Sequence, residues 1–140
     1  MSESPPPFLP PTSLTGALDD LRTALTDLKP TGQHGFEGLL ARVLSTISGQ
    51  DFRLAKSGLQ FGKDGETLAS TSPHISFEAK LYTGDIPATE VHGKITQLIG
   101  SSAPPDIWVL GATVEAGTQL LDPMQSAAEK NGIAILVLDW

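Results

Sequence analysis

The sequence contains no cysteine and no uninterrupted apolar run close to the ~20 residues that a membrane helix needs. The missing cysteines exclude a disulfide scaffold, thiolate zinc sites and a cysteine nucleophile, and they fit the reducing cytoplasm, where we expect the protein. The first residues, MSESPPPFLPP, lack the basic and then apolar layout of a secretion signal. We therefore expect no membrane partner.

Basic residues are scarce: 9 lysines and arginines stand against 16 acidic residues, for a net charge of −7. Long-range attraction to nucleic acid is therefore weak for the chain as a whole. Five of the nine bases lie between residues 35 and 84, where the acidic residues are equally numerous. Any contact with a polyanion is expected in that segment.

The 140 residues suffice for one domain, and the first thirty lie outside its expected core. Five prolines make residues 1–12 an arm that is either extended or disordered. Thr12 or Ser13 caps an N-terminal helix that occupies 13–30 and reaches about Leu28. One stripe on this helix packs on the core or pairs with a second copy in a homo-oligomer, and it contains Leu14, Leu18, Leu21, Leu25 and Leu28.

Residues 35–140 have the pattern of an α/β domain with a mixed sheet flanked by helices on both faces. A helix over 35–48 should bury Phe36, Leu40, Val43 and Ile47 and end at Gly49. Further helices are expected over 87–99 and 117–130, and strands over 51–57, 66–69, 75–82, 107–110 and 133–139. The last strand reads as buried on both faces, and the chain ends directly after it, so we expect a domain excised from a longer protein.

The strand ISFEAKLY (75–82) carries the most informative polar residues. Side chains two apart share a face of a strand, so Glu78 and Lys80 lie side by side. By themselves they fit an ordinary ion pair on a solvent-facing surface. Tyr82, on the same face, is either a strand-end aromatic or a group that stacks on a base. The three histidines show no ligand spacing and are expected at the surface.

Other polar residues converge on the same sheet edge. Asp64 begins the preceding strand in a glycine-rich turn, Glu37 lies at the edge of a buried helix face, and Gln60 precedes Asp64 by four residues. Three carboxylates beside one lysine repel each other unless a cation lies among them. Carboxylate oxygens without a histidine pair favour Mg²⁺ or Mn²⁺ over Zn²⁺.

The segment GFEGLL, followed by GLQFGKDGE and ISFEAK, resembles the PD-(D/E)xK phosphodiesterases, the restriction-endonuclease-like superfamily. Their αβββαβ core corresponds to residues 35–111. The chain is most similar to the Mrr-like nuclease domains at the N-terminus of bacterial anti-phage STAND NTPases. The resemblance implies a metal-dependent endonuclease effector domain that cuts double-stranded DNA in anti-phage defence and is activated by oligomerisation. It also implies a C-terminal NTPase or sensor module.

The resemblance assigns roles residue by residue. Asp64, Glu78 and the Ala79 carbonyl hold Mg²⁺ or Mn²⁺, and Lys80 positions or deprotonates the attacking water. Glu37 binds a second ion or a water molecule, and Gln60 matches a polar position of a family variant. Lys63 replaces the proline that precedes the motif aspartate in many members. The DNA backbone is expected to contact Arg53, Lys56 and Lys63.

One alternative stays open at this point. The chain can be a non-catalytic interaction module of the same fold, in which the leucine-striped helix mediates assembly. The Glu78–Lys80 pair is then a structural ion pair.

Overall fold

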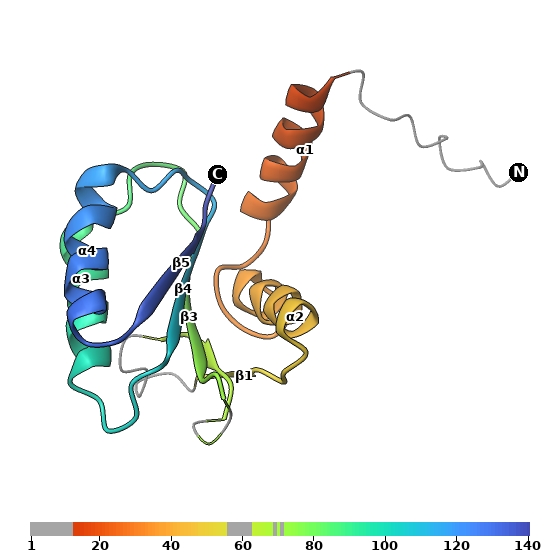
Figure 1. Ribbon diagram of the computed structural model, residues 1–140. Helices are drawn as coiled ribbons and strands as arrows, with labels where there is room; N and C mark the ends of the chain where they lie inside the picture. The colour runs from red at the N-terminus through yellow and green to blue at the C-terminus, as the bar shows by residue number, and fades with distance from the viewer. Residues whose placement is uncertain (1–12, 56–62, 69, 71) are drawn as a thin grey trace, which may run out of the picture.

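The computed structural model describes residues 13–55, 63–68, 70 and 72–140. Helices and strands follow one another in the order of an α/β domain (Figure 1). They are α1 (Leu14–Thr26), α2 (Phe36–Ser48), β1 (Arg53–Leu54), β2 (Gly65–Glu66), β3 (Ile75–Lys80), α3 (Ala88–Ile99), β4 (Ile107–Ala112), α4 (Thr118–Lys130) and β5 (Ala134–Leu138). From α2 to β4 this is the predicted αβββαβ order.

The strands form one five-stranded mixed sheet in the order β1-β2-β3-β4-β5. The pairs β1–β2 and β2–β3 are antiparallel, whereas β3–β4 and β4–β5 are parallel. The parallel pairs are connected through α3 and α4, because parallel neighbours need a crossover connection. The predicted α/β class with a mixed sheet is confirmed, and its central strand, β3, contains Glu78 and Lys80.

Helices cover both faces of the sheet, with α2 on one face and α3 and α4 on the other (Figure 1). The α2 side holds a small apolar cluster of Leu40, Leu44, Ile75, Phe77 and Val109. The α3–α4 side holds a larger one that includes Val91, Ile95, Leu98, Trp108, Leu110 and Met124. Since Ile75 and Phe77 face α2, the alternating residues Ser76, Glu78 and Lys80 face α3. The α2 helix packs so close that a Cβ on Gly111 would lie 2.5 Å from Leu40 Cδ2.

Several predicted elements differ in extent. Within the described residues β1 and β2 have two residues each, so the predicted strands 51–57 and 66–69 are too long, and β3 ends at residue 80 instead of 82. Helix α2 ends at Gly49 as predicted, but Leu44 completes its buried face while Val43 and Ile47 are exposed. Helix α1 buries none of its own residues, and Val43 and Ile47 of α2 remain exposed.

Strand β5 was predicted to be buried on both faces, and this is wrong. It is an edge strand on which Ile135 and Val137 pack against the α3–α4 cluster, whereas Leu136 on the opposite face is exposed. The reason is the position of α2, which packs on β1 and β3 and leaves much of the β5 surface uncovered.

Helix α1 projects from the body of the domain (Figure 1). Ser13 caps it, accepting a 3.0 Å hydrogen bond from Gly16 N–H, and the helix ends at Thr26, two residues before the predicted end. Leu14, Leu18 and Leu21 are 76%, 42% and 50% exposed, whereas Leu25 and Leu28 are half-buried, so no leucine of the stripe is fully buried in the core. No helix in the described part of the chain is long and apolar enough to span a membrane.

Candidate active site

Asp64 and Glu78 lie where the β2–β3 ladder ends. The last paired residues are Gly65 and Phe77, and the two acids are the next residue on each strand. The Asp64 N–H donates to the Phe77 carbonyl at 2.7 Å, and the Ala79 N–H donates to Asp64 Oδ2, also at 2.7 Å. These two bonds fix the Asp64 carboxylate against β3, one residue beyond Glu78.

Lys80 is the centre of a second set of contacts, which reaches from β3 to α3. Its Nζ lies 3.1 Å from Glu78 Oε1 and forms an ion pair with Glu90 Oε1. The Tyr82 hydroxyl donates to Glu90 Oε2 at 2.8 Å. One turn further along α3, Lys94 Nζ lies 3.8 Å from Glu78 Oε1. The site therefore joins two acids of the sheet with two lysines, a third acid and a tyrosine.

Burial excludes a solvent-facing ion pair. Glu78 is 2% exposed, Lys80 7% and Asp64 8%. Burial raises the pKa of Asp64, although the Ala79 N–H and the Lys80 cation oppose the shift. Burial and then the charge of Asp64 raise the pKa of Glu78, and they outweigh the opposing charge of Lys80. The expectation that Glu78 and Lys80 form an ordinary surface pair is therefore wrong.

Both Glu90 and Glu78 compensate the charge of Lys80. Burial lowers the pKa of Lys80, but the hydrogen bond with Glu90 and the charge of Glu78 outweigh it, so the net shift is upward. The hydrogen bonds from Lys80 and Tyr82 lower the pKa of Glu90. Opposite shifts in two partners are what a real ion pair produces, whereas the raised pKa of Glu78 reflects a carboxylate whose charge is incompletely compensated.

Glu37, near the start of α2, belongs to the same electrostatic cluster. Burial first, then the charge of Asp64 and to a smaller extent that of Glu78 raise its pKa to about 7, against a hydrogen bond from the Gly32 backbone. The structure thus brings the three predicted carboxylates into mutual influence. The pKa of Glu37 therefore lies near neutral pH.

Three features of this cluster fit a hard divalent cation. Glu78 Oε2 is buried and has no hydrogen-bond partner among the described residues. A cation would relieve the repulsion between Asp64 and Glu78. The Ala79 carbonyl points to the same strand edge as its N–H, which faces Asp64. Across the described ranges, no three His, Asp or Glu side chains form a metal site by themselves, so a cation here would need the Ala79 carbonyl and water as further ligands.

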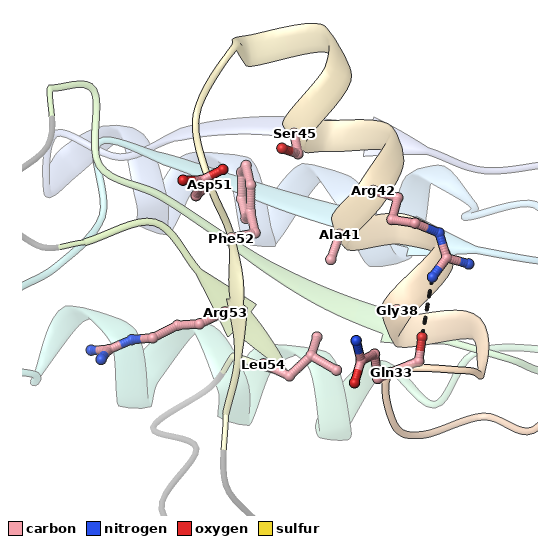
Figure 2. Close-up of a pocket in the computed structure, with 9 residues that line it drawn as sticks. All are labelled: Gln33, Gly38, Ala41, Arg42, Ser45, Asp51, Phe52, Arg53 and Leu54. Atoms are coloured by element: carbon pink, nitrogen blue, oxygen red, sulfur yellow. Dashed lines mark hydrogen bonds between the residues drawn. The ribbon is translucent and has the colours of Figure 1, made fainter.

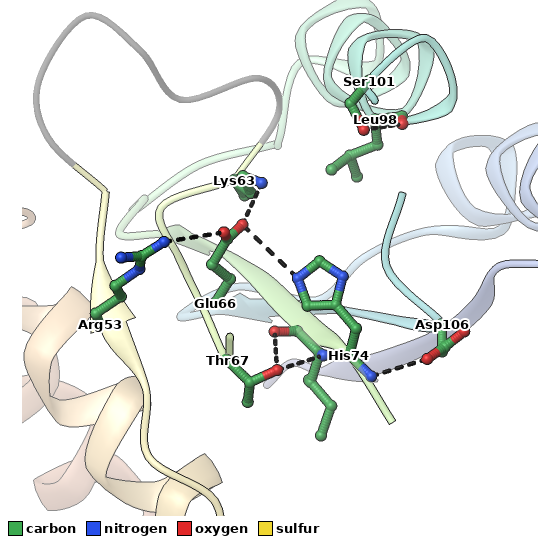
Figure 3. Close-up of polar contacts among 9 residues, drawn as sticks. Arg53, Lys63, Glu66, Thr67, His74, Leu98, Ser101 and Asp106 are labelled. Atoms are coloured by element: carbon green, nitrogen blue, oxygen red, sulfur yellow. Dashed lines mark hydrogen bonds and ion pairs between the residues drawn. The ribbon is translucent and has the colours of Figure 1, made fainter. Parts of the chain in front are cut away.

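Two of the predicted DNA-contacting residues, Arg53 and Lys63, contact Glu66 on β2 (Figure 3). Lys63 forms an ion pair with Glu66, and Arg53, whose side chain is 70% exposed, reaches it at 4.0 Å. His74 Nε2 lies 3.9 Å from Glu66 Oε2, and the His74 N–H donates to Asp106 Oδ2 at 2.8 Å. His74 is buried, so its predicted surface position is wrong. Gln60 and Lys56 lie outside the described residues.

A groove of about 430 Å³ runs between α2 and β1, with Phe52 and Leu54 on one side and Gly38 and Ala41 on the other (Figure 2). Neither the acids of the β2–β3 ladder end nor Lys80 line it. The groove is therefore separate from the acidic cluster.

Sequence reasoning missed Glu90 and Lys94. Both lie on α3, four residues apart, and therefore on one face of the helix. Their spacing was a usable signal, but it does not reveal that this face turns toward β3. Tyr82 was recognised only as an aromatic residue of open role.

Several residues on which the sequence resemblance to PD-(D/E)xK nucleases rests lie close together in the structure. Asp64, Glu78 and Lys80 meet at the end of the β2–β3 ladder, and Glu37 approaches from α2. Comparison of the chain with protein-family models, curated proteins and solved structures finds no match.

Proposed function

We propose that this chain is a Mg²⁺- or Mn²⁺-dependent nuclease domain of the PD-(D/E)xK type, which hydrolyses phosphodiester bonds of double-stranded DNA. The observation that carries the proposal is the buried pair of like charges, Asp64 and Glu78, with Lys80 beside it and Glu78 Oε2 without a partner. Burying like charges together is costly for a fold, so such a cluster is kept for chemistry more often than for stability.

The roles of the side chains follow from their positions. Asp64, Glu78 and the Ala79 carbonyl are the groups that would hold the cation. When bound, the cation supplies Lewis-acid stabilisation of the negative charge that develops on the phosphate. Lys80 donates a hydrogen bond that orients the attacking water. Glu37, with a pKa of about 7, holds or releases a proton in the pH range where such a reaction proceeds.

Weak intrinsic affinity for DNA is expected from the net charge of −7. Of the two predicted DNA contacts that the structure describes, Arg53 has a side chain that is 70% exposed, whereas that of Lys63 is 15% exposed and forms an ion pair with Glu66. Assembly would raise the local concentration of sites on DNA. We therefore propose an effector domain of anti-phage defence that works in the cytoplasm and is activated by oligomerisation through α1, with an NTPase or sensor module attached in the full protein.

A plasmid-nicking assay at high protein concentration, with Mg²⁺ or Mn²⁺ and with EDTA, tests the proposal. The wild type should nick and then linearise the plasmid, and Asp64→Asn should lose the activity because a carboxylate of the cluster is gone. Glu129→Gln removes one exposed charge from α4 and should cut normally. Wild-type rates in Asp64→Asn would contradict the site.

A second candidate function is a non-catalytic assembly module of the same architecture. The exposed leucines of α1 favour it, since a helix that buries no residue in its own domain leaves that stripe available to a second copy. This candidate predicts self-association without cleavage under any metal condition, and the same assay therefore separates the two.

A further inference from the structure

Glu90 connects Lys80 to the rest of the fold through both of its carboxylate oxygens. Oε1 forms the ion pair with Lys80 Nζ, and Oε2 accepts the hydrogen bond from the Tyr82 hydroxyl. Glu90 lies in the first turn of α3, whereas Lys80 and Tyr82 belong to the end of β3 and the residues after it. The contact therefore joins α3 to the end of β3. It lies on the face of the sheet that holds Glu78, opposite to the face that α2 covers.

Tyr82 is itself held in place by the neighbouring strand. Its N–H donates to Thr113 Oγ1 at 3.0 Å, and the Thr113 hydroxyl donates back to the Tyr82 carbonyl at 2.7 Å. Thr113 directly follows β4 and is fully buried. A continuous series of hydrogen bonds thus leads from the buried end of β4 through Tyr82 and Glu90 to Lys80.

The Lys80–Glu90 pair is buried on one side only: the Lys80 side chain is 8% exposed and the Glu90 side chain 38%, so solvent screens the carboxylate. The series of hydrogen bonds restricts the motion of the Lys80 side chain. A lysine has a flexible four-carbon stem, and a single contact leaves it mobile. Glu78 alone would hold Nζ from one side, and Glu90 fixes it from a second direction.

We propose that Glu90 is a positioning residue for Lys80 in phosphodiester hydrolysis and that Tyr82 holds the Glu90 carboxylate in the required orientation. The proposal rests on the proposed nuclease function and deepens it. Glu90 does not touch the scissile phosphate or the cation ligands; it limits where the Lys80 ammonium can lie. The active site accordingly includes α3 as well as the β2–β3 ladder and α2.

Glu90→Gln is the first test variant, because glutamine keeps the shape and an acceptor for Tyr82 but removes the charge that holds Lys80. With plasmid as substrate, kcat should fall about 10- to 100-fold, as is typical for the loss of a supporting contact, while KM for DNA stays unchanged. Tyr82→Phe, which removes only the hydroxyl, should lower kcat less. Glu129→Gln is the matched charge control and should keep both constants.

A second readout is independent of cleavage. In protein labelled with ¹⁵N-lysine, the Lys80 ammonium signal of the wild type should show restricted motion by NMR relaxation, and Glu90→Gln should shift its mobility toward that of an exposed lysine such as Lys130. Wild-type protein that cuts no DNA would overturn the proposed function and with it the role of Glu90 in hydrolysis. Active wild type with unchanged or higher kcat in Glu90→Gln, or with Lys80 equally ordered in both, would overturn the positioning role alone.

Discussion

Glu78→Gln tests whether the paired carboxylates hold a cation. The substitution keeps the volume and the hydrogen-bonding shape of the side chain and removes one of the two charges at the end of the β2–β3 ladder. Without metal, two effects on stability oppose each other. The variant loses the ion pair with Lys80, and breaking a buried pair costs about 3–5 kcal/mol. It also no longer buries a charge beside Asp64, and the raised pKa of Glu78 shows that this second effect is substantial. We expect a net loss below about 3 kcal/mol and a folded variant.

The response to metal is larger and has a definite sign. A cation that binds only the folded protein adds about 2.7 kcal/mol to the free energy of unfolding when its concentration is about a hundred times Kd. For a chain of 140 residues this raises Tm by about 9 °C. Glu78→Gln removes one of the two carboxylates that carry this binding, so its Tm should be nearly independent of Mg²⁺ and Mn²⁺.

Thermal melts followed by circular dichroism, in EDTA and in rising Mg²⁺ or Mn²⁺, measure this difference. Glu129→Gln should shift like the wild type, because it removes the same charge far along α4 and leaves the cluster intact. An equal shift in wild type and Glu78→Gln would show that the cation binds elsewhere. If the Tm of the wild type does not change with Mg²⁺ or Mn²⁺, the cation site itself is refuted.

Two further predictions concern α1 and Glu37. Leu18→Glu combined with Leu21→Glu should leave the domain folded, because half-exposed leucines contribute only about 1 kcal/mol each, and should shift any oligomer toward monomer in light scattering; an unfolded variant would show that α1 is packed. The folded chain keeps the Glu37 proton up to about pH 7, whereas the unfolded chain releases it near the usual value of 4.5, so the free energy of unfolding should fall as pH rises through that window. Urea titrations across the window should show a smaller fall in Glu37→Gln, and an equal fall in both proteins would contradict the assigned shift.

Much of the fold could be predicted because local signals and packing agree. The glycine at 49 adopts the left-handed conformation that ends α2, and the run of apolar residues at 107–110 lies in β4, which is buried from Trp108 to Ala112. The lengths of β1 and β2 could not be predicted, since the extent of a strand depends on pairing with its neighbours and not on its own alternation. The prediction that β5 is buried on both faces was wrong for a related reason. Its apolar sequence does not reveal that α2 packs on β1 and β3 instead.

The sheet half of the candidate site followed from the sequence because alternation within one strand places Glu78 beside Lys80, and a glycine-rich turn places Asp64 next to them. The α3 half did not, because the rotation of a helix about its axis is decided by its apolar residues. Val91, Ile95 and Leu98 bury one face of α3 against the sheet. That packing turns Glu90 and Lys94 toward the end of β3, where they meet Lys80 and Glu78.

The same reasoning explains why the sequence left two roles open for the leucine stripe of α1. A periodic pattern states which side chains share a face, but it says nothing of what lies opposite that face. For β3 the opposing surface is supplied by α3, which follows it directly in the chain and must cross over the sheet to reach β4. For α1 no such constraint exists, because it precedes the first core element and contacts the body through Arg22, 5.5 Å from the Trp140 ring. A leucine stripe on such a helix is as well suited to a second copy as to its own domain, and the exposure of Leu14, Leu18 and Leu21 favours the second copy.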